Sequence, residues 1–175
     1  MTPWAYGLNT FGDLFTSRQL VALTTFSDLL PALRDKVLAD ASSKGWLDDG
    51  LDLDNGGGGP LAYADALAVM LSFALDKFAD LGNSLCGWEP IAQCPRHLFG
   101  RQAISMVWDF AEGNPFSSSS GSWDVFVEGI VKAHEKAFAG ARPEWIGSAT
   151  QADAATQIVS SGSRPVDCRT GVESV

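Results

Sequence analysis

Apolar residues between positions 20 and 38 recur every three or four residues, which is the period of one face of an α-helix. Thr16 and Gln19 stand before them at the spacing of a capping box, so a helix is predicted to begin at Ser17. Pro31 lies inside this segment, where a kink or a break is expected because proline removes a backbone donor; Pro31 is also a candidate first residue for a second helix. The apolar face consists of Leu20, Leu23, Phe26, Leu30, Leu33, Val37 and Leu38.

Three later segments also have a helical period. One begins at Pro60, which suits the first turn of a helix, and keeps apolar residues on one side as far as Phe78. A shorter helix is predicted from about Arg101 to Phe110, and another over 123–138 with Gly140 as its carboxy-terminal cap. The pattern thus predicts a mainly α fold, an irregular helical domain of about four helices with long loops, and only one modest strand candidate, at 157–160.

The charge of the chain limits what it can bind. With 175 residues and a formal net charge of −9, it has the length of one compact domain and a field that repels polyphosphates. Binding to duplex DNA by the chain alone is therefore not expected. No apolar run approaches the roughly 20 residues needed to cross a bilayer, so no membrane partner is predicted. An odd count of three cysteines and the lack of a secretory signal favour a reducing, cytoplasmic location.

Several blocks of the sequence resemble, in the same order, a family of large prokaryotic adenine-specific DNA methylases that begin with a conserved domain of unknown function. The blocks are FGDLFTSRQLVALTTFSDL at 11–29, YADALAVMLSFALDKFAD at 63–80, NSLCGW at 83–88, FGRQAISMVWDFAEGNPFSSSSGSW at 99–123 and QADAATQ at 151–157. The resemblance covers most of the chain up to about Gly162. It is specific because several separated blocks agree together.

The resemblance implies that residues 1–162 form a helical insertion of an α/β methyltransferase that uses S-adenosylmethionine, between its glycine motif and its catalytic D-P-P-Y motif. Neither motif is present in this chain. The catalytic motif is expected just after Gly162, where the chain instead reads SRPVDCRTGVESV, so residues 163–175 are interpreted as a non-native or disordered tail, the product of a frameshift, a chimeric gene or a cloning scar. The resemblance also makes Asp153 a candidate strand-end acid near the cofactor adenine; the alternative is an exposed cap of a short helical turn.

One polar and basic group is a candidate for contact with nucleic acid in the complete enzyme. Arg96, Arg101 and Gln102 lie close in sequence to Trp88 and Trp108, and arginine beside tryptophan can contact a phosphate or support base stacking.

The same residues have a structural interpretation. An arginine that starts a helix beside tryptophans more often bridges loop carbonyls, or pairs here with Asp109 or Glu112.

Three other groupings are interpreted as structural. Residues 114–116 read Asn-Pro-Phe, a shortened likeness of the catalytic motif, but a turn is the preferred interpretation because the second proline is missing. Cys86, Cys94 and His97 have residue types that bind zinc, yet a spacing of eight between the cysteines is unlike a zinc knuckle. The serine-rich stretch at 117–122 is interpreted as a loop.

Two functions follow as expectations. The chain is expected to be a fragment of a DNA adenine-N6 methyltransferase, from a restriction-like or phage-defence locus, that lines the DNA-side cleft and is inactive alone. Its cofactor and its DNA would then be bound by the complete enzyme, with no cofactor expected for this chain. The alternative is a stand-alone helical interaction module that docks through its tryptophan-rich first fifteen residues.

Overall fold

The protein is mainly α in the computed structural model, which describes residues 3–100, 103–104 and 106–140. This confirms the predicted fold class, although the described part contains three α-helices rather than about four. In chain order the elements are the 3-10 helices η1 (Pro3–Tyr6) and η2 (Phe11–Leu14), the helices α1 (Ser17–Ser43) and α2 (Pro60–Leu81), the strands β1 (Trp88–Glu89) and β2 (Cys94–Pro95), and the helix α3 (Trp123–Phe138).

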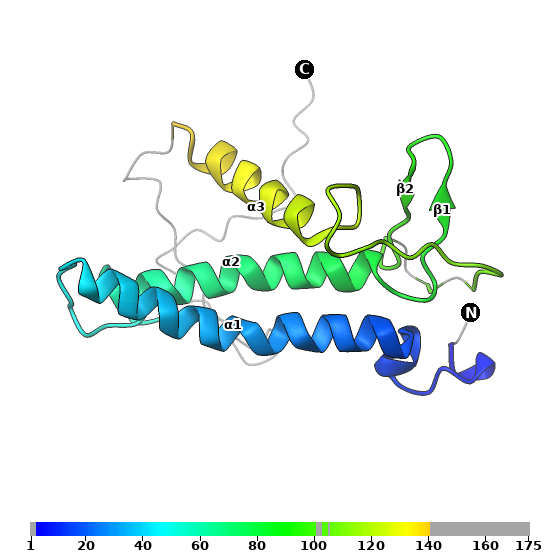
Figure 1. Cartoon of the computed structure of the whole chain (residues 1–175), viewed down its shortest axis with the longest axis horizontal. Helices are drawn as coiled ribbons and strands as arrows, with labels where there is room; N and C mark the ends of the chain where they lie inside the picture. The colour runs from blue at the N-terminus through cyan, green and yellow to red at the C-terminus, as the bar shows by residue number, and fades with distance from the viewer. Residues whose placement is uncertain (1–2, 101–102, 105, 141–175) are drawn as a thin grey trace, which may run out of the picture. The chain divides into compact units, whose positions relative to one another are not determined.

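Helices α1 and α2 lie side by side and antiparallel (Figure 1). Helix α1 begins at Ser17, as predicted, because Thr16 and Gln19 form the capping box: the Gln19 N–H donates to Thr16 Oγ1 at 3.3 Å, and the Thr16 N–H donates to Gln19 Oε1 at 2.8 Å. The predicted start of α2 at Pro60 is also confirmed. Both beginnings are therefore set by residues next to them in the sequence.

The predicted break at Pro31 is wrong, since α1 continues through it to Ser43. Pro31 is on the exposed side of the helix, where its ring meets solvent. Phe26, five residues earlier, packs toward α2, and Arg34, three residues later, pairs with Asp65 of α2. These contacts hold both halves of α1 against the same partner, so the loss of one backbone hydrogen bond does not end the helix.

The loop between α1 and α2 is organised by aspartate side chains. Asp49 accepts hydrogen bonds from the N–H groups of Gly58, at 2.7 Å, and Leu51, at 3.2 Å. These bonds favour the ionised carboxylate and lower the pKa of Asp49. At Gly57 an added Cβ would lie 2.2 Å from the Leu51 carbonyl oxygen, so this position requires glycine.

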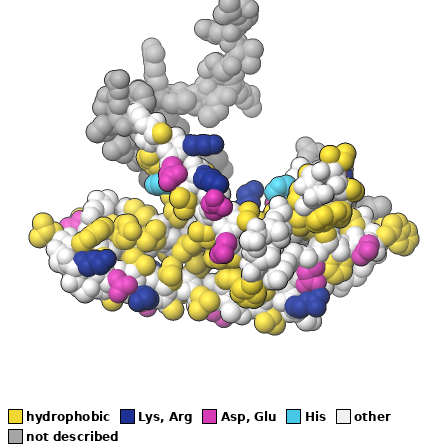
Figure 2. Space-filling view, turned by 45° about the horizontal axis from the view of Figure 1, so that its top comes forward, with side chains coloured by type: hydrophobic (Ala, Val, Ile, Leu, Met, Phe, Trp, Pro, Cys, Tyr) yellow, Lys and Arg dark blue, Asp and Glu magenta, His cyan; other side chains and the backbone are white. Residues whose placement is uncertain are grey.

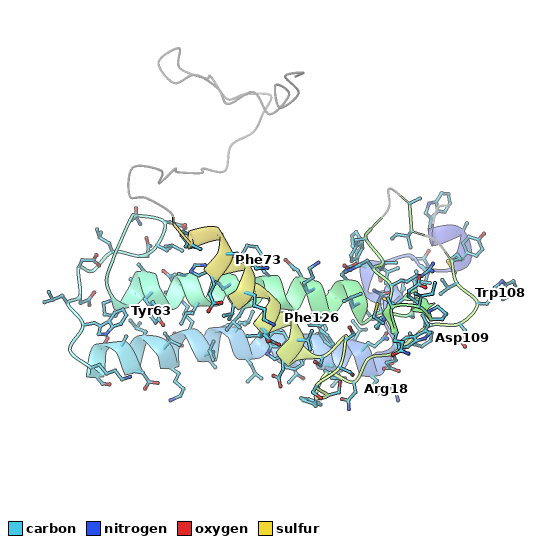
Figure 3. The ribbon with its side chains drawn as sticks, turned by 90° about the horizontal axis from the view of Figure 1, so that it is seen from above. Arg18, Tyr63, Phe73, Trp108, Asp109 and Phe126 are labelled. Atoms are coloured by element: carbon cyan, nitrogen blue, oxygen red, sulfur yellow. The ribbon has the colours of Figure 1, made fainter. Side chains whose placement is uncertain are left out.

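Helix α3 packs on α2 with its first half, and its last turns are exposed. Seen from above, it crosses over both long helices (Figure 3). Phe126 is 7% exposed and packs with Ala74 and Phe78 of α2 in one hydrophobic cluster. Figure 3 shows Phe126 on α3 above the two long helices. Trp123 extends the cluster by stacking on Phe26 of α1, with ring centroids 4.3 Å apart. The helix predicted over 123–138 and its left-handed Gly140, with φ +83°, are confirmed.

A second cluster joins the amino-terminal segment to the connection after α2. Leu14, Leu85, Cys86 and Leu98 form its buried part. The Leu14 carbonyl oxygen accepts two hydrogen bonds from Ser84, one from its N–H and one from its hydroxyl, both at 2.8 Å. The antiparallel pair β1 and β2, in which Trp88 faces Pro95, extends from this cluster.

The helix predicted from about Arg101 to Phe110 is wrong at the positions that the structure describes there, 103–104 and 106–110, which are irregular. Ile104, Met106 and Val107 pack individually against the second cluster. Immediately after them, the Ala111 N–H donates to the Cys86 carbonyl oxygen at 2.7 Å. A short helix is costly to nucleate, so the contacts of this segment with the second cluster determine its conformation instead of its helical periodicity. The strand candidate at 157–160 and the tail at 163–175 lie outside the described residues.

Candidate functional site

Arg96 is fixed by the pair of short strands. It follows β2, its backbone N–H donates to the Gly87 carbonyl oxygen at 2.8 Å, and its guanidinium forms an ion pair with Glu89 of β1. Arg96 therefore has an acidic partner in Glu89, whereas the predicted pairing with Asp109 or Glu112 concerns an arginine that begins a helix, Arg101, which lies outside the described residues. Since Arg96 is more than half exposed, a phosphate could reach it only in competition with that carboxylate.

His97 is held in the same way. Its Nδ1 lies 2.5 Å from Oδ2 of Asp80, whose other carboxylate oxygen accepts the Phe99 N–H at 2.9 Å. The Asp80 carbonyl oxygen also accepts the Leu98 N–H at 3.2 Å. Asp80 therefore fixes the chain from 97 to 99 against the end of α2, and the contact of His97 is part of this anchoring.

The two tryptophans named with this group have exposed rings. Trp88 is 53% exposed and Trp108 is fully exposed, and Figure 3 shows Trp108 projecting away from the ribbon close to Asp109. A shallow cavity of about 520 Å³ is lined by Trp88, Asp109, Phe110, Ala111 and Glu112. Its two charged lining residues are acidic, and although Glu112 is paired with Arg18, the lining itself supplies no cation for a phosphate ligand.

The remaining predicted site residues, Arg101, Gln102 and Asp153, lie outside the described residues. Of the candidate nucleic-acid contacts, the described structure therefore places only Arg96.

The other described arginines are also paired. Arg18 of α1 reaches across to Glu112, with its Nε 3.0 Å from the carboxylate Oε1, and Arg34 pairs with Asp65. Lysines 132 and 36 each pair one turn away, with Glu128 and Asp40. In the part of the chain that the structure describes, each arginine thus forms an ion pair with a carboxylate. These arginines do not form the basic face that is typical of a nucleic-acid binder.

The interpretation of 114–116 as a turn is confirmed. The Asn114 Oδ1 accepts the Phe116 N–H at 3.0 Å, and the Asn114 carbonyl oxygen accepts the Ser117 N–H at 3.1 Å. The serine-rich stretch forms the loop that leads into α3. Its last member, Ser122, is fully buried and caps that helix by accepting the Val125 N–H.

Cys86 and Cys94 have different surroundings. Cys86 is fully buried and donates its S–H to the Asp80 carbonyl oxygen at 3.2 Å, and burial raises the pKa of its thiol. Cys94 lies in β2 and is partly exposed. Among the described residues, no three His, Cys, Asp or Glu side chains are grouped to hold a metal ion.

Sequence reasoning missed a cavity of about 560 Å³ beside the beginning of α1. Gln19, recognised in the sequence only as a capping residue, lines this cavity and is 4% exposed. No local pattern indicates it, because its walls come from α1, from the end of α2 and from the chain at 112–116.

No protein-family model, curated protein or solved structure matches the chain.

Proposed function

We propose that the chain is the helical part of a DNA adenine-N6 methyltransferase that uses S-adenosylmethionine, and that it lines the DNA-side cleft of the complete enzyme. The proposal rests on the series of sequence blocks between 11 and 157, which resemble that family and occur in the same order.

The chain is inactive alone in this proposal. An exocyclic adenine nitrogen is a poor nucleophile, so methyl transfer needs a pocket for the donor and polar groups that hold the amino group beside it. The family's glycine motif and D-P-P-Y motif would supply these, and both are missing from the sequence. The ion pairs of Arg18 and Arg96 agree with a chain that does not bind DNA tightly alone.

Exposed apolar side chains on the helices support the proposal that another domain packs against them. Leu29 of α1 is 55% exposed and Phe73 of α2 is 52% exposed, and large apolar residues on a free surface are typical of interfaces. Figure 2 shows apolar side chains covering broad areas between scattered charges. The methyltransferase core is the partner that the proposal assigns to this surface.

Titration of the purified chain with S-adenosylmethionine, and separately with duplex DNA at physiological salt, tests the proposal. We expect neither ligand to bind with a dissociation constant below about 10⁻⁴ M, the weak limit of non-specific DNA binding. Tight binding of either one, or transfer of radiolabelled methyl groups to DNA by the chain alone, contradicts the assignment.

The reading frame on both sides of the coding segment supplies a second test. A glycine motif encoded upstream and a D-P-P-Y motif encoded downstream, in any frame, are expected. A gene that encodes neither would remove the basis of the proposal.

A second candidate function is a stand-alone interaction module. It is favoured by the aromatic residues of the first segment, since Trp4, Tyr6 and Phe11 are 69%, 51% and 81% exposed. The state of the purified chain distinguishes the two functions. A monodisperse monomer with one sharp melting transition supports the module, whereas aggregation or partial unfolding supports a part that lacks its core.

A further inference from the structure

The cavity beside the beginning of α1 has the size and the walls of a small-ligand site. Its volume of about 560 Å³ lies within the range of roughly 300–1,000 Å³ that ligand pockets occupy. Phe26, Phe78 and Phe116 form aromatic walls: the centroids of Phe26 and Phe78 are 5.6 Å apart with the rings edge to face, and those of Phe26 and Phe116 are 6.1 Å apart. Flat aromatic groups pack well in such surroundings.

Gln19, whose side chain lines the cavity, has an unused hydrogen-bond donor just beneath the wall. Its Oε1 is occupied by the Thr16 N–H, whereas its Nε2 is buried and has no hydrogen-bond partner. A buried amide nitrogen without a partner is costly, by about 1–3 kcal/mol, so native structures usually satisfy it. An acceptor atom brought by a ligand would do so.

The other polar groups of the cavity already have partners and supply no unpaired charge for a charged ligand. Arg18 and Glu112 neutralise each other across it. The Thr25 hydroxyl donates to the Val21 carbonyl oxygen at 2.6 Å, and the Asn114 Oδ1 accepts from the backbone of Phe116. The cavity is thus mostly apolar, and what it offers a ligand is a donor rather than a net charge.

We infer that this cavity binds an uncharged, planar aromatic molecule that carries a hydrogen-bond acceptor, such as an aromatic amide or a neutral heterocycle. Phe26, Phe78 and Phe116 lie around the ring, with Phe116, which is 84% exposed, at its open side. Gln19 Nε2, which is buried beneath the wall, turns toward the cavity to donate to the acceptor. The Arg18–Glu112 pair joins the chain at 112 to α1 and so holds two of the cavity's walls together. This inference is independent of the proposed methyltransferase assignment.

Benzamide is the probe for the test, and the full chain is titrated with it while the amide signals of the protein are followed by two-dimensional NMR. We expect a dissociation constant of about 1 mM, in keeping with the small number of heavy atoms, and shifts that include the Gln19 side-chain amide. Benzoate, which is charged, and cyclohexanecarboxamide, which is not aromatic, should each bind at least about tenfold more weakly.

Two variants with one matched control locate the site. Ala22→Leu places a larger side chain in the cavity lining and should weaken benzamide binding at least about tenfold, whereas Ala32→Leu, the same change at an exposed position of α1, should leave it unchanged. Gln19→Glu keeps the acceptor for the Thr16 N–H and removes the donor, so binding at pH 7.5 should fall at least about fivefold.

Circular dichroism of each variant must first show wild-type helix content. No saturable binding of benzamide up to 10 mM, roughly ten times the expected dissociation constant, overturns the inference and leaves the cavity to a side chain of a protein partner. Wild-type affinity in folded Ala22→Leu, or in folded Gln19→Glu, also overturns it.

Discussion

Arg34 of α1 and Asp65 of α2 join the two long helices through an ion pair in which Nε lies 2.6 Å from Oδ1. The other oxygen of Asp65 accepts the Leu53 N–H at 3.3 Å, so the same carboxylate also holds the loop between the helices. The hydrogen bond from Arg34 is the main reason that the pKa of Asp65 is lowered in the folded chain, and the Leu53 N–H adds to it. The Arg34–Asp65 pair therefore makes the packing of α1 on α2 depend on the ionisation of Asp65.

The stability of the chain should therefore depend on the ionisation of Asp65. Because its pKa is lower in the folded chain than in the unfolded chain, the stabilisation is complete above the ordinary aspartate pKa of about 3.9 and is lost as the pH falls through the lower folded value. Asp65→Asn should lower the free energy of unfolding at pH 7, and its difference from wild type should shrink below about pH 4. Urea denaturation between pH 7 and pH 2.5 measures this.

Asp35→Asn is the control for that prediction. The Asp35 Oδ1 lies 3.6 Å from the Arg34 Nη1, and the Asp35 side chain is 77% exposed, so solvent screens this interaction. The Asp35→Asn change should therefore have little effect on the free energy of unfolding at any pH in this range. A constant difference between Asp65→Asn and wild type over the whole pH range would contradict the prediction.

Pro31→Ala should stabilise the chain. Pro31 is exposed and lies inside the unbroken α1, so the change restores a backbone N–H without removing a buried contact. Proline in a helix interior is about 3 kcal/mol less favourable than alanine, and proline regains part of this by restricting the unfolded chain, so a gain of about 1–3 kcal/mol is expected. Thermal unfolding followed by circular dichroism measures it.

A control at the neighbouring exposed position, Ala32, should change the stability in the opposite direction. Ala32→Gly should lower the stability by about 1 kcal/mol, the usual cost of glycine in a helix. If Pro31→Ala melts below the wild type, the continuous helix through Pro31 is contradicted.

Helix beginnings could be predicted from the sequence because their causes are local. Thr16 with Gln19 and the proline at 60 act within one turn of the residues they cap, so the printed sequence contains the whole signal. The continuation of α1 through Pro31 depends on Arg34 meeting a residue 31 positions later, which no local pattern records.

The candidate site could not be predicted as well, because its contacts also join residues that no local sequence pattern connects. The contact of Arg96 with nucleic acid stays a prediction, and its ion pair with Glu89 follows from the register of β1 and β2, in which Glu89 faces Cys94. That strand pair depends on a tight return in which Gln93 has a φ of +51°, and the sequence gives little sign of it. The periodic apolar pattern near Trp108 was misleading, because this residue is fully exposed.

Phe126→Ala should separate α3 from the other helices. Phe126 is 7% exposed and its ring centroid lies 6.4 Å from that of Phe78, so truncation leaves a cavity and should cost about 3–5 kcal/mol. Phe138→Ala on the same helix, where the side chain is 62% exposed, should change the stability by no more than about 0.5 kcal/mol. Equal losses in the two variants, measured by urea denaturation, would contradict the packing of α3.

The two described cysteines should react at different rates. A thiol reacts as its thiolate, and burial both shields Cys86 and raises its pKa, so less thiolate is present at any pH near neutrality. Cys94 is partly exposed in β2. In a Cys168→Ser background, which leaves only these two thiols, Cys94 should react with a disulfide reagent at pH 8 at least about tenfold faster than Cys86.

Single variants assign the two rates, since Cys86→Ser should remove the slow phase and Cys94→Ser the fast one. In guanidinium chloride the rates should converge, because unfolding removes the burial that distinguishes the thiols. A fast Cys86 in the native chain would mean that the cluster around Leu14 opens readily. Since the Cys86 carbonyl oxygen accepts the Ala111 N–H, such opening would also release the chain at 112–116, which Arg18 and Glu112 hold against α1.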